Sequence, residues 1–128
     1  MHEFALAEAV AVAAIENARA SGIANVTRID VRVGELQQID PEAFRFAIEG
    51  MIAAKVDVTF EPARFSCRRC GRAYGLADTP GPGGHDASEA IHFVPELVHA
   101  FLRCPACASP DFAVTAGRGV MLGAIEGD

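Results

Sequence analysis

The sequence has 128 residues, the length of one ordinary domain or of two very small ones. Hydrophobic residues make up 51% of the chain, and the formal net charge of −6 argues against a general nucleic-acid binder, because phosphate neutralisation needs clustered positive charge. No apolar run approaches the roughly 20 residues of a membrane span, and Glu3 stands where a signal peptide would be basic, so we expect a cytoplasmic protein.

A helix and then a strand are predicted at the start of the chain. From Phe4 to about Ala18 apolar residues recur at helical spacing, and Gly22 marks a left-handed cap after that helix. One face of the helix gathers the following residues: Phe4, Ala7, Ala11, Ile15 and Ala18, with Leu6, Val10 and Ala14 beside it. In residues 26–33, Asp30 and Arg32 alternate with the apolar Ile29, Val31 and Val33, and Val26 precedes them, which predicts a half-buried strand.

A second helix is predicted to begin at Asp40-Pro41-Glu42. Asp40 suits the N-cap, Pro41 the first helical position, and Glu42 the positive end of the helix dipole. The helix is expected to bury four residues at helical spacing: Phe44, Ala47, Ile48 and Met51. Residues 55–60 alternate again and predict a second strand.

The character of the chain changes at Glu61-Pro62. A segment with all four cysteines follows, interrupted by the Gly/Pro-rich residues 75–90 and the apolar residues 91–102. Two strand-like runs surround Gly117-Arg118-Gly119 near the end. We therefore predict an α+β fold with two helices on a three-stranded mixed sheet and an inserted small zinc-ribbon-like domain. The predicted domains are 1–62 plus 115–128, and 63–114.

The cysteines form two pairs, CRRC at Cys67 and Cys70 and CPAC at Cys104 and Cys107. Two residues between cysteines let both thiolates face one ion, and two such turns complete a tetrahedral S4 shell that suits Zn²⁺. Iron is a less usual occupant, and a pair of redox dithiols is the alternative without metal. Four protein ligands leave no open position, so we expect a structural site and not a catalytic one.

Five arginines lie near the cysteines: Arg64, Arg68, Arg69, Arg72 and Arg103. We expect them to offset the negative charge of the thiolates. The alternative is a zinc-ribbon interaction module that binds RNA or protein, although stacking aromatic residues are few near the motif.

The chain has four histidines. We expect His85 to be solvated in the Gly/Pro-rich stretch. His92 and His99 are spaced to lie on one face of a helix, although Pro95 between them can start or kink it, and the alternative is that each is an ordinary partly buried histidine. His2 differs, because its imidazole, its amide nitrogen and the terminal amine could chelate one ion. Such a nitrogen field suits Ni²⁺ or Cu²⁺ and not Zn²⁺. From these residues alone, a chelate and a plain helix start both stay open.

Five motifs together resemble the HypA/HybF family of nickel metallochaperones: MHE at 1–3, VGEL at 33–36, DPEAFRFA at 40–47, CRRC and CPAC. The resemblance covers nearly the whole chain. The segment IHFVPELVHAFLRCPAC and GRGV at 117–120 are most similar to archaeal-type members with a longer insert between the cysteine pairs, and a related bacterial chain is the alternative.

The resemblance implies roles for individual residues. It makes His2 the nickel ligand with Met1 beside it and Glu3 as a modulator of affinity, and His99, less clearly His92, an added ligand. It assigns structural zinc to the four cysteines.

The resemblance also implies partners, namely a HypB-type GTPase and the [NiFe]-hydrogenase large-subunit precursor, or urease in some members. Gly81-Pro82-Gly83-Gly84 is not followed by Lys and Ser/Thr, so GTP hydrolysis would belong to the partner. We expect a protein that is not an enzyme and that binds Ni²⁺ transiently. We expect it to be a monomer or a homodimer and to bind neither nucleic acid nor a membrane.

Overall fold

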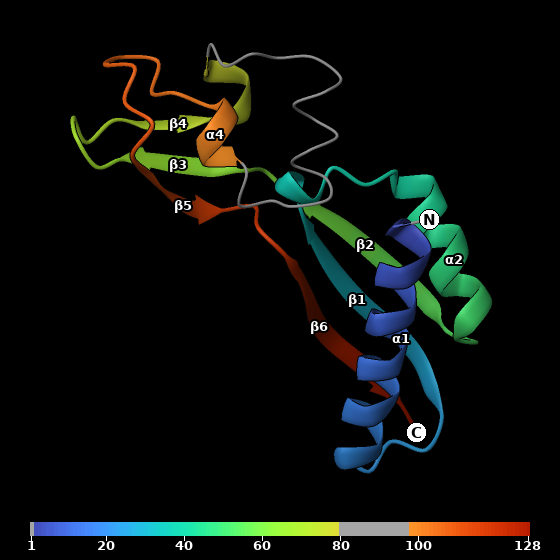
Figure 1. The fold of residues 1–128 in the computed structure, drawn as a ribbon. Helices are drawn as coiled ribbons and strands as arrows, with labels where there is room; N and C mark the ends of the chain where they lie inside the picture. The colour runs from blue at the N-terminus through green and yellow to red at the C-terminus, as the bar shows by residue number, and fades with distance from the viewer. Residues whose placement is uncertain (1, 80–97) are drawn as a thin grey trace. The chain divides into compact units, whose positions relative to one another are not determined.

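The computed structural model describes residues 2–79 and 98–128. The chain forms two compact units (Figure 1). The first unit comprises Met1–Arg32, Ile39–Thr59 and Val120–Asp128, and the second, here called the cysteine unit, comprises Val33–Gln38 and Phe60–Gly119. None of the helices in the described residues is long and apolar enough to cross a membrane.

Two helices cover a three-stranded sheet in the first unit, as the sequence predicts. The strand order is β2-β1-β6. The elements are α1 (His2–Ala20), β1 (Val26–Gly34), α2 (Pro41–Met51), β2 (Lys55–Glu61) and β6 (Val120–Gly127).

The order of contacts between strands gives their directions. Along β1 and β2 the residue numbers of the contacts rise together, because Arg28 contacts Asp57 and Val31 contacts Thr59, so these strands are parallel. Between β1 and β6 the numbers run in opposite directions, because Arg28 contacts Glu126 and Gly34 contacts Gly119, so these strands are antiparallel. The sheet is therefore mixed, which confirms the predicted fold class.

Local chemistry sets the start of α2 and the end of α1. The Asp40 carboxylate accepts hydrogen bonds from the amides of Glu42 and Ala43 at 2.9 and 3.2 Å, and Pro41 opens α2. Gly22 adopts φ +78° just after α1, a conformation that costs little only for glycine. Both predicted caps are confirmed.

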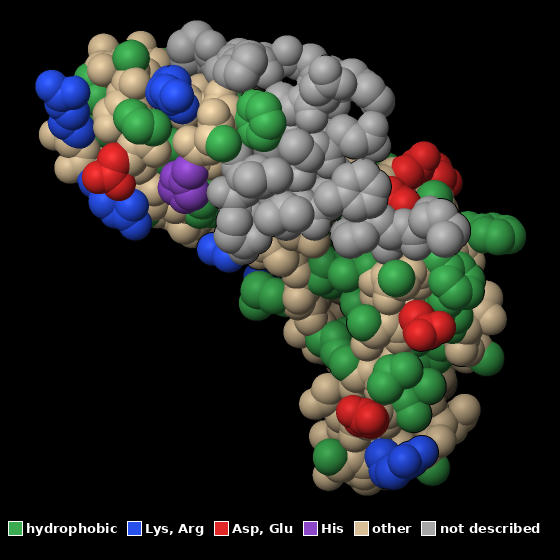
Figure 2. Space-filling view, viewed as in Figure 1, with side chains coloured by type: hydrophobic (Ala, Val, Ile, Leu, Met, Phe, Trp, Pro, Cys, Tyr) green, Lys and Arg blue, Asp and Glu red, His purple; other side chains and the backbone are tan. Residues whose placement is uncertain are grey.

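The buried face of α1 differs from the predicted one. Five residues are buried: Ala7, Val10, Ala11, Ala14 and Ala18. Phe4 and Ile15 are 57% and 41% exposed, and apolar side chains are visible over α1 and α2 in Figure 2. Small alanines let α1 pack closely, so the inward stripe is centred on them and the larger apolar residues lie on its flank.

A second three-stranded sheet forms the cysteine unit. Its strands are β3 (Arg64–Cys67), β4 (Ala73–Gly75) and β5 (Phe112–Ala116), in the antiparallel order β4-β3-β5. The unit also contains the short helices η1 (Glu35–Gln37), η2 (Leu76–Asp78) and α4 (Val98–Phe101). The predicted roles of His85, His92 and Pro95 fall on residues outside the described ranges.

The VGEL motif packs inside the cysteine unit. Leu36 is buried in the core of that unit, and the Glu35 carboxylate accepts a hydrogen bond from the Ala63 amide at 2.8 Å. A Cβ on Gly34 would lie 2.2 Å from the carbonyl oxygen of Gly117, so only glycine fits there. This close approach accounts for the glycine of the motif.

Candidate metal centre

Two similar turns present the four cysteines. In the first, the Cys67 carbonyl accepts from the Gly71 amide at 2.9 Å, and in the second the Cys104 carbonyl accepts from the Ala108 amide at 2.9 Å. Gly71 and Ala108 both adopt positive φ, +80° and +62°. Each turn therefore folds back tightly and directs both of its thiols to the same side.

Backbone pairing closes each turn. The Cys67 amide donates to the Arg72 carbonyl at 2.9 Å, and the Cys104 amide donates to the Ser109 carbonyl at 3.0 Å. The first turn joins β3 to β4, and the second follows α4. The two CxxC motifs are thus two copies of one local structure.

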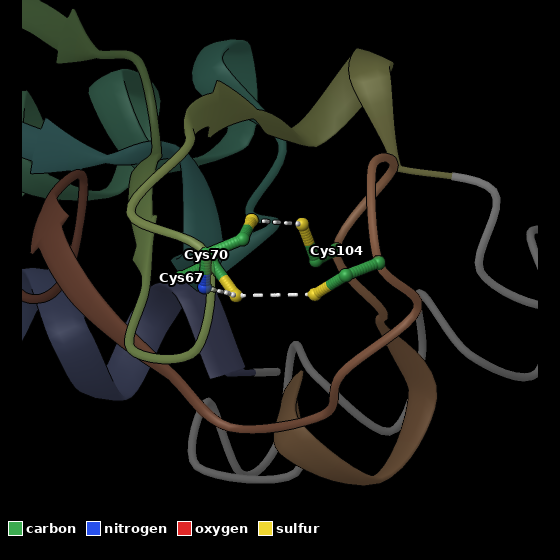
Figure 3. Close-up of side chains that lie close together, drawn as sticks. Cys67, Cys70 and Cys104 are labelled. Carbon is green, nitrogen blue, oxygen red and sulfur yellow. Dashed lines mark hydrogen bonds between the residues drawn. The ribbon is translucent and has the colours of Figure 1, made fainter.

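The four sulfurs gather at one point (Figure 3). All four lie within 4.8 Å of one another, and Cys67 to Cys107 and Cys70 to Cys104 are each 3.6 Å apart. A tetrahedral zinc ion with Zn–S bonds of about 2.3 Å would place its sulfurs about 3.8 Å apart. The cluster therefore fits a four-coordinate ion, and the described residues hold no other group of three or more such ligands.

Backbone amides favour the charged form of two cysteines. The Cys70 amide donates to the Cys67 sulfur at 3.5 Å and lowers the pKa of the Cys67 thiol to about 6. Burial opposes ionisation of Cys104, but hydrogen bonds from the amides of Cys107 and Ala106 and from the thiols of Cys70 and Cys107 together outweigh burial and hold its pKa below the usual value.

Cys107 behaves in the opposite way. The Ser109 amide lowers the pKa of Cys107, but burial and the three neighbouring sulfurs outweigh that bond and raise the pKa to about 11. Without a cation, four adjacent sulfurs cannot all carry charge, so they share protons. A divalent ion removes that conflict.

The site is closed on its inner side and open on its outer side. Cys67 and Cys104 are buried, and Cys70 is exposed. Beneath them lies an apolar core that includes Phe65, Tyr74 and Phe112. If all four thiolates bind one ion, no coordination position is left for a substrate, which fits a structural role.

No arginine side chain in the described part of the chain donates a hydrogen bond to a cysteine sulfur. Arg68 donates to the Asp111 carboxylate at 2.9 Å and to the Phe112 carbonyl at 3.2 Å, and Arg103 donates to the Leu102 carbonyl at 2.9 Å. Among the described residues, only backbone amides and other thiols bond to the sulfurs. Any effect of these arginines on the thiolates therefore acts at a distance.

The predicted nickel ligands lie in different units. Met1 is outside the described residues, and α1 begins at His2. Glu3 accepts a hydrogen bond from the Asp40 amide at 3.2 Å, which ties the first turn of α1 to the cap of α2. His99 is exposed on α4 of the cysteine unit, so its pairing with His2 stays a prediction.

His99 has a neighbour that the sequence did not indicate. Its ring stacks on that of Phe112, with centroids 4.3 Å apart and planes at 29°. Phe112 in turn contacts the rings of Phe65 and Tyr74. No spacing rule links residues 99 and 112, because the contact depends on how α4 packs on β5.

Comparison with known proteins identifies the chain. The family model described as "Hydrogenase/urease nickel incorporation, metallochaperone, hypA" matches residues 1–127. The hydrogenase maturation factor HypA of Thermococcus sibiricus is 46% identical, covering 100% of this chain and 99% of that protein. The HypA of Pyrococcus furiosus is 40% identical, covering 98% and 94%.

The fold also has solved counterparts. The solution structure of the Ni metallochaperone HypA from Helicobacter pylori matches with a TM-score of 0.60 and 20% identity, over 98% of this chain and 97% of that one. The family model and the archaeal relatives confirm the resemblance found in the motifs. They also confirm the prediction that the protein is a maturation factor and not an enzyme. The chain belongs to the HypA family of nickel-incorporation metallochaperones.

Proposed function

We propose that the protein binds Ni²⁺ at its N-terminus and delivers it to the [NiFe]-hydrogenase large subunit during maturation. The observation that carries the proposal is membership of a nickel-incorporation family, together with MHE at the start of α1. Nickel binding is assigned to the domain predicted over 1–62 plus 115–128, and zinc binding to 63–114.

The start of α1 suits a nickel chelate. The first four amides of an α-helix have no intrahelical acceptor, so the His2 amide can lose its proton without breaking a helix hydrogen bond. The positive end of the helix dipole also favours the anionic nitrogen that results. The Met1 amine, the His2 amide and the His2 imidazole then supply three nitrogens, and the chelate requires that the Met1 amine be free.

His99 is the proposed fourth ligand. Its exposed ring leaves a nitrogen accessible, while stacking on Phe112 limits the orientations of the imidazole and so reduces the entropy lost on binding. Glu3 is proposed to modulate affinity through its position beside the chelate. Docking on a partner would withdraw His99 and release the ion.

The four cysteines are proposed to hold structural Zn²⁺. Their sulfur separations and their lack of an open position support that role. The proposed partners are a HypB-type GTPase and the hydrogenase large-subunit precursor, the proposed location is the cytoplasm, and the protein would be a monomer or homodimer.

Nickel titration, followed by the d–d absorption bands, tests the proposal. Adding Gly-Ser before Met1 should lower the affinity at least about 100-fold, because even changes outside the ligand set cost 10–100-fold. His99→Ala should cause a smaller loss, and His85→Ala, a histidine outside the proposed set, should cause none. An extended chain with the native affinity and spectrum would refute the chelate.

A further inference from the structure

Tyr74 is the only tyrosine of the chain and is 1% exposed. Its hydroxyl oxygen is fully buried and has no hydrogen-bond partner among residues 2–79 and 98–128. Buried polar groups are almost always paired, because burial removes their bonds to water. This hydroxyl therefore needs an explanation that its present surroundings do not supply.

The sheet register places Tyr74 beside the metal centre. Tyr74 on β4 lies opposite Phe65 on β3, with ring centroids 5.3 Å apart. Cys67 follows Phe65 by two residues and so lies on the same face of β3. The tyrosine ring thus packs on the face of the sheet that carries a metal ligand.

The surrounding core offers the hydroxyl few acceptors. Besides Tyr74, the buried cluster consists of apolar residues and two cysteines: Leu36, Ala63, Phe65, Val98, Leu102 and Phe112, with Cys67 and Cys104. Within this cluster, the two sulfurs are the only other polar side-chain atoms.

The hydroxyl stays protonated at neutral pH. Burial, followed by the charge of the four cysteines with Cys104 foremost, raises the pKa of Tyr74 to about 12. At neutral pH the group is therefore a hydrogen-bond donor. A thiolate is a stronger acceptor than a thiol, because hydrogen bonds to charged groups are the stronger ones.

We propose that Tyr74 is a positioning residue of the metal centre, whose hydroxyl donates a hydrogen bond to a ligand thiolate of this core, Cys67 or Cys104, when the site holds its ion. The inference rests on the tetrathiolate site of the proposed function. Sulfurs up to 4.8 Å apart must close to about 3.8 Å around zinc. That movement changes the distance between the sulfurs and the hydroxyl.

Tyr74→Phe tests the proposal, because it keeps the ring and removes only the hydroxyl. Zinc affinity, measured by competition with a chromophoric chelator, should fall by roughly tenfold to a hundredfold, the effect of one hydrogen bond to a charged group. With Co²⁺ as a spectroscopic substitute, the sulfur-to-cobalt charge-transfer band should shift. Metal-free protein should be no less stable than wild type, because the variant removes an unpaired buried group.

Thr115→Val is the matched control. Its hydroxyl lies in the same unit and donates to the Arg64 carbonyl at 3.1 Å, but Thr115 is exposed and outside the core cluster. Deleting it should leave zinc affinity and the cobalt spectrum unchanged.

A measurement on the wild type complements the variant. Because the chain has one tyrosine, ¹³Cζ-tyrosine labelling yields a single NMR signal that should shift when zinc is added. If Tyr74→Phe binds zinc and cobalt as wild type does, the inference is wrong. If the Tyr74 hydroxyl instead bonds to a buried water, Tyr74→Phe should destabilise the metal-free and the zinc-loaded protein equally. That result would also overturn the inference. Failure of the wild type to bind one thiolate-coordinated ion would instead overturn the centre itself.

Discussion

At the scale of single residues, the two cysteine turns differ in the residue that adopts positive φ. Both need a residue with positive φ, and the first turn has Gly71 there while the second has Ala108. A left-handed conformation costs a residue with a Cβ about 1–2 kcal/mol. Glycine avoids this cost but loses about 0.5–1 kcal/mol of entropy on folding. The turn that ends in alanine therefore carries strain that its counterpart avoids.

Ala108→Gly should stabilise the zinc-loaded protein by about 0.5–1 kcal/mol, the difference between those two effects. Gly71→Ala should destabilise it by a similar amount. Urea unfolding measures both. The control is Ala106→Gly, in the same turn but without positive φ, which should not stabilise. A gain at Ala106 equal to that at Ala108 would show that strain is not the cause.

Residue-scale features were predictable where their cause is local in sequence. Asp40 and Gly22 act on amides and angles of their own neighbours, so both caps followed from spacing. The CxxC spacing likewise determines a turn. Tyr74 was missed, because its burial and its unpaired hydroxyl arise from packing between β4, β3 and β5.

At the scale of elements, strand length limited what could be predicted. The long strands β1 and β2 alternate over enough residues to be recognised, whereas β3 and β4 have four and three residues. Periodicity has little meaning over so few positions. The burial of α1 was shifted for a related reason, since it depends on which neighbour the helix packs against.

The first sheet has one electrostatic connection across all its strands. Arg28 on β1 pairs with Asp57 on β2 and with Glu126 on β6, and also contacts Asp30. The hydrogen bond from Arg28 is the main reason that the pKa of Asp57 lies below its usual value. A depressed folded-state pKa means that Asp57 stabilises the fold above its unfolded pKa of about 3.9. That stabilisation is lost as the pH falls through the lower folded pKa.

Arg28→Met should raise the pKa of Asp57 and flatten the loss of stability in acid. The carboxyl ¹³C titration of Asp57 measures the first effect, and urea unfolding between pH 5 and pH 2 measures the second. Arg32→Met is the control, since that arginine is also on β1 but has no ion pair among residues 2–79 and 98–128. An unchanged Asp57 titration in Arg28→Met would contradict the assignment.

At the scale of the whole molecule, we expect the two units to depend on metal differently. The cysteine unit has a core in which two of the nine buried residues are proposed zinc ligands, Cys67 and Cys104. The first unit is held by apolar packing of α1 and α2 on its own sheet, without cysteines. Binding energy of a structural ion is folding energy for the unit that supplies its ligands.

Removing zinc with a chelator should therefore loosen the cysteine unit alone. Amide exchange should speed up at Cys67 and Cys104, whose amides close the two turns, while the amides of β1 keep their protection. Hydrogen exchange read by NMR resolves these sites. Equal acceleration in both units would show that the molecule unfolds as one body.

The same argument links zinc to nickel through His99. Phe112, on which His99 stacks, belongs to the core that also contains the proposed zinc ligands Cys67 and Cys104. If His99 is the fourth nickel ligand, removing zinc should lower nickel affinity in the wild type by about as much as His99→Ala does. In His99→Ala, removing zinc should have no further effect, because the ligand that depends on the core is already absent. Additive losses would mean that zinc affects nickel by a route other than His99.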